Sequence, residues 1–218
     1  MRPVDLRLYA VADPAAMAGH DPVDAVMAAV RGGATLVQLR DKRGDARATV
    51  ALARRLKAAL PASVPLLIND RVDVAAVAGA DGVHLGQEDL SPAAARELLG
   101  EDAIVGLTVH HAHEATADAR IDYVGLGPAF ATASKHPRDA PLGPEGLARL
   151  LGEVRARLGA LPACAIAGID AERAPAVVSA GVDGVAVIGA LFQAADVEAA
   201  ARTLRRAVDA ALVERRDP

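Results

Sequence analysis

The sequence predicts a single-domain (β/α)8 TIM barrel that occupies residues 1–218. Short runs rich in Val, Ile and Leu alternate along the chain with longer stretches of helical period, which is typical of parallel strands joined by helices. Two related segments, GADGVHL from Gly79 and GVDGVAV from Gly181, lie 102 residues apart (181 − 79), as expected for units four and eight of a repeat. Eight units of roughly 25 residues nearly fill the chain. The main alternative, an open doubly wound sheet, would leave two edge strands.

The strands are predicted from their β-branched and Leu-rich runs, at residues 8–12, 35–40, 65–69, 82–85, 104–109, 123–127, 163–167 and 184–188. Helical periods lie between them. In the stretch 46–60, for example, Val50, Ala53 and Leu56 share one face with Leu52. Helix starts are expected where a capping side chain precedes such a stretch, at Asp21, Asp45 and Ser91. Helix ends are expected at Gly32, Gly79 and Gly181, and a helix over residues 196–214 closes the last unit.

Composition and charge exclude several classes of partner. The formal net charge is −4, so the chain has no global positive field for nucleic acid or an anionic membrane surface. The apolar residues at the start are interrupted by Asp5 and Arg7, and no apolar run approaches the length of a membrane span. The only cysteine, Cys164, excludes an internal disulfide framework and is interpreted as a small buried apolar residue. A cytoplasmic protein is expected.

Two carboxylates at predicted strand ends indicate a metal site. Asp70 ends the third predicted strand and Asp89 follows the fourth. Adjacent strands lie about 4.8 Å apart, so these carboxylates would repel unless a cation or a shared proton lay between them. Oxygen ligands without a nearby Cys or His pair fit Mg²⁺. The structural alternative is that Asp70 only caps the next helix.

The cations at the same rim indicate a pocket for a diphosphate. The chain has three lysines and 21 arginines, yet two of the lysines, Lys42 and Lys135, lie in predicted strand-end loops. Together with Arg40 they could neutralise a diphosphate, although ordinary exposed charge is the simpler interpretation of most such residues. Lys57, on a helix face, is expected to be solvated.

A second anion site is predicted at the end of the barrel, where Gly168 and the Ile188–Gly189 step follow the last two strands. Barrels often bind phosphate there through backbone N–H groups, although these glycines could equally serve only as tight turns. His84 is expected to face the barrel interior. His110, His111 and His113 lack the spacing of a common zinc motif, and the Gly125–Gly127 pair lacks the third glycine of a dinucleotide fingerprint.

The order of QLRDK, LINDRVDVA, ADGVHLGQEDL, YVGLGPAFATASK and GVDGVAVIGAL resembles that of thiamine-phosphate synthases, over residues 8–192. The resemblance implies a Mg²⁺-dependent transferase that joins 4-amino-2-methyl-5-hydroxymethylpyrimidine diphosphate to a thiazole phosphate and releases pyrophosphate. It implies catalytic roles for Arg40, Lys42 and Lys135, and Mg²⁺ ligation by Asp70 and Asp89. Binding of the pyrimidine diphosphate is implied for Gln38, Leu39, Arg40, Asp41, Lys42, Asn69, Thr108 and Lys135. Binding of the thiazole phosphate is implied for Thr132, Ala133, Ser134, Gly168, Ile188 and Gly189.

Five positions depart from the family pattern. Thr108 stands where Ser is common, which keeps the hydroxyl, and Ala133–Ser134 replaces a Pro–Thr step. Ala167 stands where Gly is typical. Gly189 replaces a Ser, so only its backbone could bind phosphate; a lost hydroxyl bond is worth roughly 1 kcal/mol.

Two other functions remain open. A related thiazole tautomerase would isomerise a thiazole phosphate without a diphosphate to expel, which fits poorly with QLRDK and the Asp70/Asp89 pair. A non-catalytic barrel that binds phosphorylated ligands would show binding without turnover. The expected partners are phosphorylated small molecules, with no nucleic acid and no membrane, and a homo-oligomer is left open by the sequence.

Overall fold

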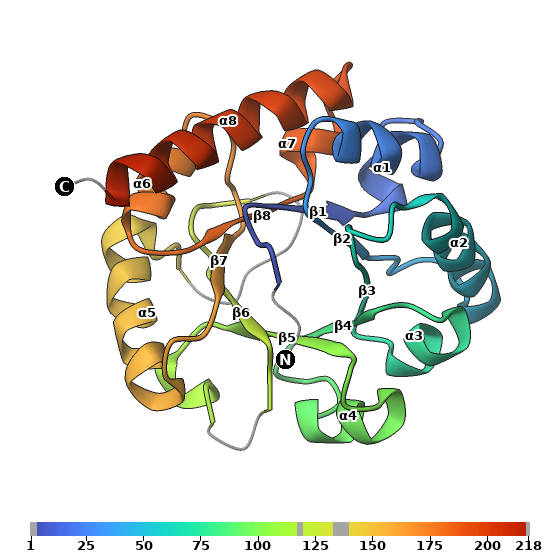
Figure 1. The fold of residues 1–218 in the computed structure, drawn as a ribbon, viewed down its shortest axis with the longest axis horizontal. Helices are drawn as coiled ribbons and strands as arrows, with labels where there is room; N and C mark the ends of the chain where they lie inside the picture. The colour runs from blue at the N-terminus through green and yellow to red at the C-terminus, as the bar shows by residue number, and fades with distance from the viewer. Residues whose placement is uncertain (1–3, 117–119, 133–139, 217–218) are drawn as a thin grey trace.

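A computed structural model of the chain describes residues 4–116, 120–132 and 140–216, and its eight parallel strands form one closed barrel (Figure 1). Each strand pairs with its neighbours in sequence, and β1 pairs with β8 to close the ring. The strands are β1 (Leu8–Ala12), β2 (Leu36–Leu39), β3 (Leu66–Asn69), β4 (Gly82–Leu85), β5 (Ile104–Val109), β6 (Tyr123–Leu126), β7 (Ala163–Ile166) and β8 (Gly184–Val187). The predicted barrel is therefore confirmed, and the open sheet is excluded.

Helices surround the barrel, and the last of them, α8, packs against both α1 and α6 across the point of closure (Figure 1). The α-helices are α1 (Pro22–Arg31), α2 (Ala46–Ala59), α3 (Val72–Ala78), α4 (Pro92–Leu99), α5 (Gly143–Leu158), α6 (Ala174–Ser179), α7 (Gly189–Phe192) and α8 (Val197–Arg216). Two short 3-10 helices, η1 (Pro14–Ala16) and η2 (Ala112–Glu114), follow β1 and β5. In the described ranges no helix is long and apolar enough to cross a membrane.

Local chemistry explains where several helices begin and end. The side chains of Asp21, Asp45 and Ser91 accept backbone N–H groups at the starts of α1, α2 and α4, as predicted. Gly79 ends α3 in the left-handed conformation (φ 69°), which glycine adopts without the clash that a Cβ would bring. The predicted helix starts at Asp21, Asp45 and Ser91 and the predicted ends at Gly32 and Gly79 are therefore confirmed.

The core has two layers, separated by the strands. Side chains inside the barrel include Tyr9, Leu36, Leu67, Tyr123 and Cys164. Alternate residues on the same strands point outward and pack against the helices in a larger apolar cluster. This alternation decides which predicted site residues can face a pocket inside the barrel.

Four side chains tie the strands together in pairs at the amino-terminal end of the barrel. Each directly precedes an even-numbered strand and accepts an N–H group at or next to the start of the preceding odd strand. The pairs are Thr35 with Leu8 (3.2 Å), Asp81 with Leu66 (2.8 Å), Asp122 with Val105 (2.8 Å) and Asp183 with Ala163 (3.0 Å). The sequence echo between Gly79 and Gly181 therefore reflects this fourfold arrangement, because it contains Asp81 and Asp183.

One expectation about surface charge is wrong. Lys57 is not simply solvated: its Nζ atom lies 2.7 and 2.6 Å from the two carboxylate oxygens of Asp81. Asp81 also accepts the Leu66 N–H group, so this cation balances a carboxylate that the strand pairing uses. Lys57 thus supports the pairing of β3 with β4.

Candidate functional site

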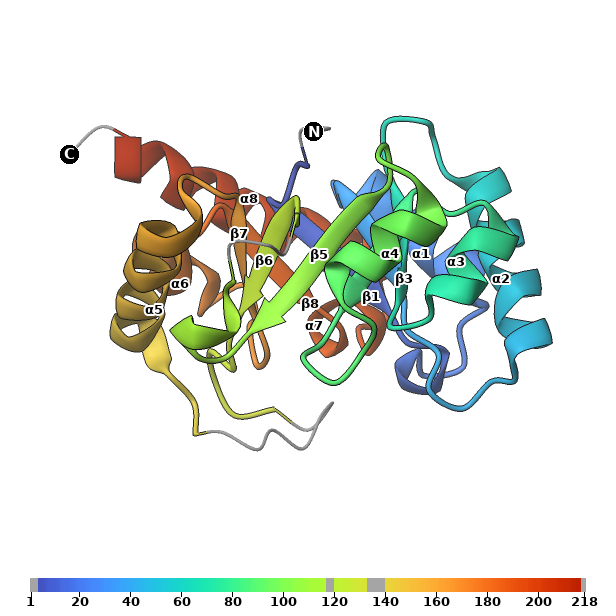
Figure 2. The same ribbon diagram turned by 90° about the horizontal axis from the view of Figure 1, so that it is seen from below.

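A pocket of about 460 Å³ opens at the carboxyl ends of the strands, a volume in the usual range for small-molecule sites. In Figure 2 the arrows of β5 and β6 point to the lower side of the view, where the segments leading from the strands to the helices lie. The pocket draws its walls from every strand or from the segment that follows it, and its floor from inward-facing side chains such as Tyr9 and His84. The site therefore lies where (β/α)8 barrels carry their chemistry.

Most of the described residues predicted for substrate binding line this pocket: Gln38, Arg40, Asn69, Thr108, Thr132, Gly168, Ile188 and Gly189. Leu39 differs, because its buried side chain (1% exposed) packs in the outer layer between barrel and helices, which leaves only its backbone for a ligand. Asp41 also differs: its carboxylate accepts the N–H groups of Arg43 and Gly44 and so shapes the loop before α2. Three further predicted residues, Ala133, Ser134 and Lys135, lie outside the described residues.

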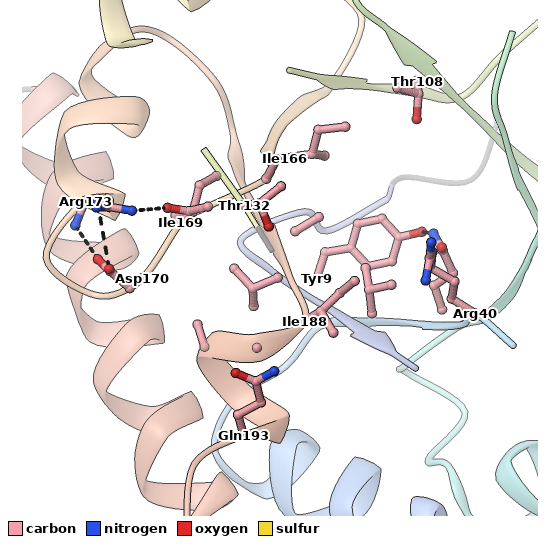
Figure 3. Close-up of a pocket in the computed structure, with 18 of the residues that line it drawn as sticks. Tyr9, Arg40, Thr108, Thr132, Ile166, Ile169, Asp170, Arg173, Ile188 and Gln193 are labelled. Atoms are coloured by element: carbon pink, nitrogen blue, oxygen red, sulfur yellow. Dashed lines mark hydrogen bonds and ion pairs between the residues drawn. The ribbon is translucent and has the colours of Figure 1, made fainter. Parts of the chain in front are cut away.

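Arg40 is held in the pocket by an ion pair with Asp13, which follows β1. Both side chains are largely buried, with 17% and 12% of their surface exposed. Asp13 also accepts the Ala15 N–H group (3.0 Å), which fixes the carboxylate at the start of η1. The guanidinium therefore has a defined orientation at one side of the pocket (Figure 3).

Asp70, Asp89 and Lys42 form an acidic pair with one cation. None of the three lines the pocket itself, but Asp70 directly follows the lining residue Asn69, and Lys42 lies two residues after Arg40. Lys42 forms an ion pair with Asp70. Asp70 has a left-handed backbone (φ 60°), so the chain turns sharply directly after Asn69. The pKa of Asp89 is raised, first by burial and further by the Asp70 carboxylate, against the opposing effects of the Gly86 N–H group and of Lys42.

Asp70 and Asp89 do not serve as caps of the helices that follow them. Helix α3 begins after Arg71 without any side-chain cap, so Asp70 does not cap it. Asp89 does have a local role, because it accepts the Gly86 N–H group at 2.7 Å, but α4 is capped by Ser91 instead. Within the described ranges no group of three or more His, Cys, Asp or Glu residues could hold a metal ion, so a metal at Asp70 and Asp89 would not take a third ligand of these types from that part of the chain.

A chain of hydrogen bonds crosses the floor of the pocket. The Gln38 amide donates to the Tyr9 hydroxyl, which lies 2.9 Å from the Tyr123 hydroxyl. His84 continues the chain, with Nδ1 2.8 Å from Tyr123 and Nε2 2.7 Å from Thr108 Oγ1. If each group donates to the next along the chain from Gln38 to Thr108, His84 accepts a hydrogen bond from Tyr123 at Nδ1 and donates one to Thr108 at Nε2. The two pocket residues Gln38 and Thr108 are thereby fixed by groups buried beneath them.

Burial raises the pKa of both Tyr9 and Tyr123 well above that of an ordinary tyrosine, so both hydroxyls stay protonated. The Tyr123 ring fits in the interior because Gly106 has no side chain: a Cβ there would lie 2.1 Å from the ring. The two tyrosines thus act as neutral hydroxyls that position their neighbours in the chain.

The opposite side of the pocket contains the tight turn at Ala167 and Gly168 and one cation, Arg173. Gly168 (φ 67°) leaves no room for a side chain, since a Cβ there would lie 2.4 Å from the Ala131 carbonyl oxygen. Ala167 precedes it with φ 74°, a left-handed conformation that favours glycine. Arg173 donates to the Gly168 carbonyl at 2.8 Å, and its guanidinium carbon lies 5.0 Å from the centre of the Phe130 ring. Figure 3 shows Arg173 and Arg40 on opposite sides of the pocket.

Sequence reasoning missed several groups that the structure brings into the pocket or directly beneath it: Tyr9, Asp13, Tyr123, Arg173 and Gln193. Alternation along β1 and β6 could have found the two tyrosines, which share the inward parity of their strands. Nothing in the sequence marks Asp13 or Arg173, because their partners Arg40 and Phe130 are distant along the chain.

Comparison with known proteins gives a consistent result. A family model described as thiamine monophosphate synthase matches residues 8–191. The thiamine-phosphate synthase of Azorhizobium caulinodans is 49% identical, covering 95% of this chain and 97% of the relative, and that of Agrobacterium fabrum is 46% identical over 99% of both. The solved structure of a thiamine phosphate pyrophosphorylase from Pyrococcus furiosus superposes with a TM-score of 0.83 at 34% identity, covering 96% of this chain and 98% of that one.

Proposed function

The chain belongs to the thiamine monophosphate synthase family of transferases, and from this premise we propose that it condenses 4-amino-2-methyl-5-hydroxymethylpyrimidine diphosphate with a thiazole phosphate by a Mg²⁺-assisted dissociative displacement. The products are thiamine phosphate and pyrophosphate. The observation that carries the proposed mechanism is the cluster of Asp70, Asp89 and Lys42 beside the Arg40 side of the pocket.

The two sides of the pocket fit the two substrates. The pyrimidine diphosphate takes the side of Arg40 and Asn69, with its ring over Gln38 and Thr108. The thiazole phosphate takes the side of Thr132, Gly168, Ile188 and Gly189. Apolar side chains such as Ile166 lie between them and would exclude water from the reacting atoms.

The donor set suits Mg²⁺ rather than a softer metal. Asp70 and Asp89 supply oxygen ligands only, and Mg²⁺ keeps waters and binds substrate phosphate oxygens at its remaining positions. The raised pKa of Asp89 fits this assignment, because two carboxylates this close are stabilised when a cation joins them. When bound, the metal would supply positive charge to the departing diphosphate.

The residues of the chain act mainly on the leaving group. As the bond between the methylene carbon and the diphosphate oxygen breaks, its electron pair leaves with the diphosphate, and Arg40, Lys42 and Lys135 stabilise the growing negative charge. The amino group of the pyrimidine ring delocalises the positive charge that develops on the methylene. The thiazole nitrogen then forms the new C–N bond with its own lone pair, so no general base is required. The pocket also contributes by orienting both rings.

The tautomerase alternative is less well supported. Isomerisation of a thiazole phosphate needs no cation cluster for a diphosphate, whereas Arg40 and Lys42 each pair with a carboxylate at the pyrimidine side. The relatives that match over nearly the whole chain are named thiamine-phosphate synthases. We propose the cytoplasm as the setting, which suits a protein whose single cysteine, Cys164, is a buried free thiol.

The role of the carboxylates is tested by Asp89→Asn, which keeps the size of the side chain but removes its charge. We expect turnover to fall by at least about a hundredfold and its Mg²⁺ dependence to weaken, with little change in thermal stability. Asp73→Asn is the matched control, because Asp73 is an exposed carboxylate that pairs with Arg71 at the start of α3. Equal losses of stability and activity in Asp89→Asn would make Asp89 structural and remove the support for the metal site.

A further inference from the structure

We propose that the guanidinium of Arg173 binds the phosphate of the thiazole substrate directly, so that the pocket recognises its second substrate by charge as well as by backbone N–H groups. This inference rests on the proposed function, because it concerns the same pocket. It adds a binding residue that the sequence motifs do not contain.

The position of Arg173 supports a direct contact. Its side chain lines the pocket beside Gly168 and Ile169. Nη1 donates to the Gly168 carbonyl at 2.8 Å, which holds the guanidinium against the turn at Gly168. The Phe130 ring supports it from the β6 side at 5.0 Å. The guanidinium is therefore oriented before any ligand arrives, as is the case for Arg40 on the other side.

Arg173 also has donor capacity to spare. A guanidinium carries five N–H donors, and one of them is used by Gly168. Its nearest carboxylate, Asp170, lies 3.9 Å from Nε, which is beyond hydrogen-bond distance, and Asp170 Oδ1 already accepts the N–H groups of Glu172 and Arg173. About half of the Arg173 side chain is exposed, so it can accept a phosphate without a large desolvation cost.

The charge balance of the pocket gives the second argument. Among the described residues that line it, Arg40 and Arg173 are the lysine or arginine cations, and they lie on opposite sides (Figure 3). On this side Gly168 and Gly189 offer only backbone groups and Thr132 offers a neutral hydroxyl, so without Arg173 no lysine or arginine among the described lining residues would face a phosphate that carries nearly two negative charges. A planar guanidinium matches the geometry of phosphate oxygens and supplies the missing charge.

The test compares a phosphorylated and an unphosphorylated substrate. In Arg173→Gln we expect the KM for thiazole phosphate to rise about tenfold or more, with the KM for the pyrimidine diphosphate unchanged. With the thiazole alcohol, which lacks the phosphate, the variant and the wild type should be equal. Arg173→Lys should show a smaller rise in the KM for thiazole phosphate than Arg173→Gln, since lysine keeps the positive charge but lacks the paired N–H donors of a guanidinium. Arg202→Gln on α8, which removes an exposed arginine paired with Glu198, is the control.

For a second variant we expect the opposite change in the KM for thiazole phosphate. Asp170→Asn keeps an acceptor oxygen for the two capped N–H groups but removes the negative charge beside Arg173, so the KM for thiazole phosphate should fall. If Arg173→Gln raised the KM for the thiazole alcohol by the same factor as the KM for thiazole phosphate, the inference would be overturned. Arg173 would then only support the Gly168 turn. An unchanged KM for thiazole phosphate would also overturn it.

The failure of this inference can be separated from failure of the proposed function. If the wild type makes no thiamine phosphate, the proposed function fails, but calorimetric titration with thiazole phosphate still tests Arg173. Tighter binding to the wild type than to Arg173→Gln supports the inference, and equal binding or none contradicts it.

Discussion

The hydroxyl groups of Tyr9 and Tyr123 lie 2.9 Å apart in the interior of the barrel, and both residues are buried, with 1% and 0% of their surface exposed. They join Gln38 to His84 and so connect two sides of the pocket floor. The sequence contains only two tyrosines and no Trp, so the near-ultraviolet absorbance of tyrosinate reports on this pair alone. The interior of the barrel can therefore be followed directly by titration.

Both tyrosines should stay neutral until the protein unfolds. Their pKa values in the fold are raised by burial above that of the unfolded chain, which is about 10. The stability that this difference contributes is fully present below about pH 10 and is lost above it, by up to about 1.4 kcal/mol per pH unit for each tyrosine. Tyrosinate absorbance should therefore rise together with the loss of helical circular dichroism. Tyrosinate formed in a protein that is still folded would show that the interior is open to solvent.

Asp13→Asn should weaken recognition of the pyrimidine diphosphate. The substitution removes the charge that holds Arg40 but keeps an acceptor for the Ala15 N–H group. With Arg40 less well oriented, kcat/KM for this substrate should fall about tenfold, which corresponds to about 1.4 kcal/mol. The KM for thiazole phosphate, measured in the same steady-state series, should not change. A parallel rise in both KM values would point to a general disturbance of the pocket.

Ala167→Gly should stabilise the protein. Ala167 has φ 74°, and a residue with a Cβ is disfavoured there by roughly 1–2 kcal/mol, from which the greater flexibility of glycine in the unfolded chain is subtracted. We expect a net gain of about 0.5–1 kcal/mol in urea unfolding. Ala165→Gly, in the adjacent strand β7, is the matched control and should instead destabilise the protein. Destabilisation by both substitutions would mean that the turn at Ala167 is not strained.

The contribution of each strand-pairing carboxylate to the free energy of unfolding should depend on how deeply it is buried. Asp122 forms a buried pair with Arg96 (2.6 Å), whose side chain is only 7% exposed and also donates to three carbonyl groups. Asp122→Ala leaves that guanidinium without its counter-charge and should cost about 3–5 kcal/mol. Asp183→Ala removes a carboxylate that is 39% exposed and should cost about 1 kcal/mol. Equal costs in urea unfolding would contradict this ranking.

The fold could be predicted closely because each unit repeats the same physical signals. The bounds of β1, β4 and β5 coincide with the predicted ranges, since apolar runs there end at polar or glycine residues. The alternation of inward-facing and outward-facing side chains along each strand could also have separated pocket residues from core residues in the predicted site. Gln38 and Arg40 have the parity that faces the interior, whereas Leu39 between them has the parity of the outer layer.

What the sequence could not predict depends on contacts between distant residues. Lys57 lies on a helix face that looks exposed, and only the fold brings Asp81 within reach of it. Arg173 looks like one of many surface arginines until Phe130 and Gly168 are placed beside it. Helix α7 spans only four residues, too few for a periodic pattern to indicate it.

The most direct test of the account is to mix the purified protein with the pyrimidine diphosphate and the thiazole phosphate, with and without Mg²⁺, and to measure thiamine phosphate and pyrophosphate together. We expect both products in equal amounts, formed only when Mg²⁺ is present. Absence of product from folded protein that binds both substrates would contradict the proposed transfer and favour a non-catalytic barrel, and failure to bind the pyrimidine diphosphate would favour the tautomerase.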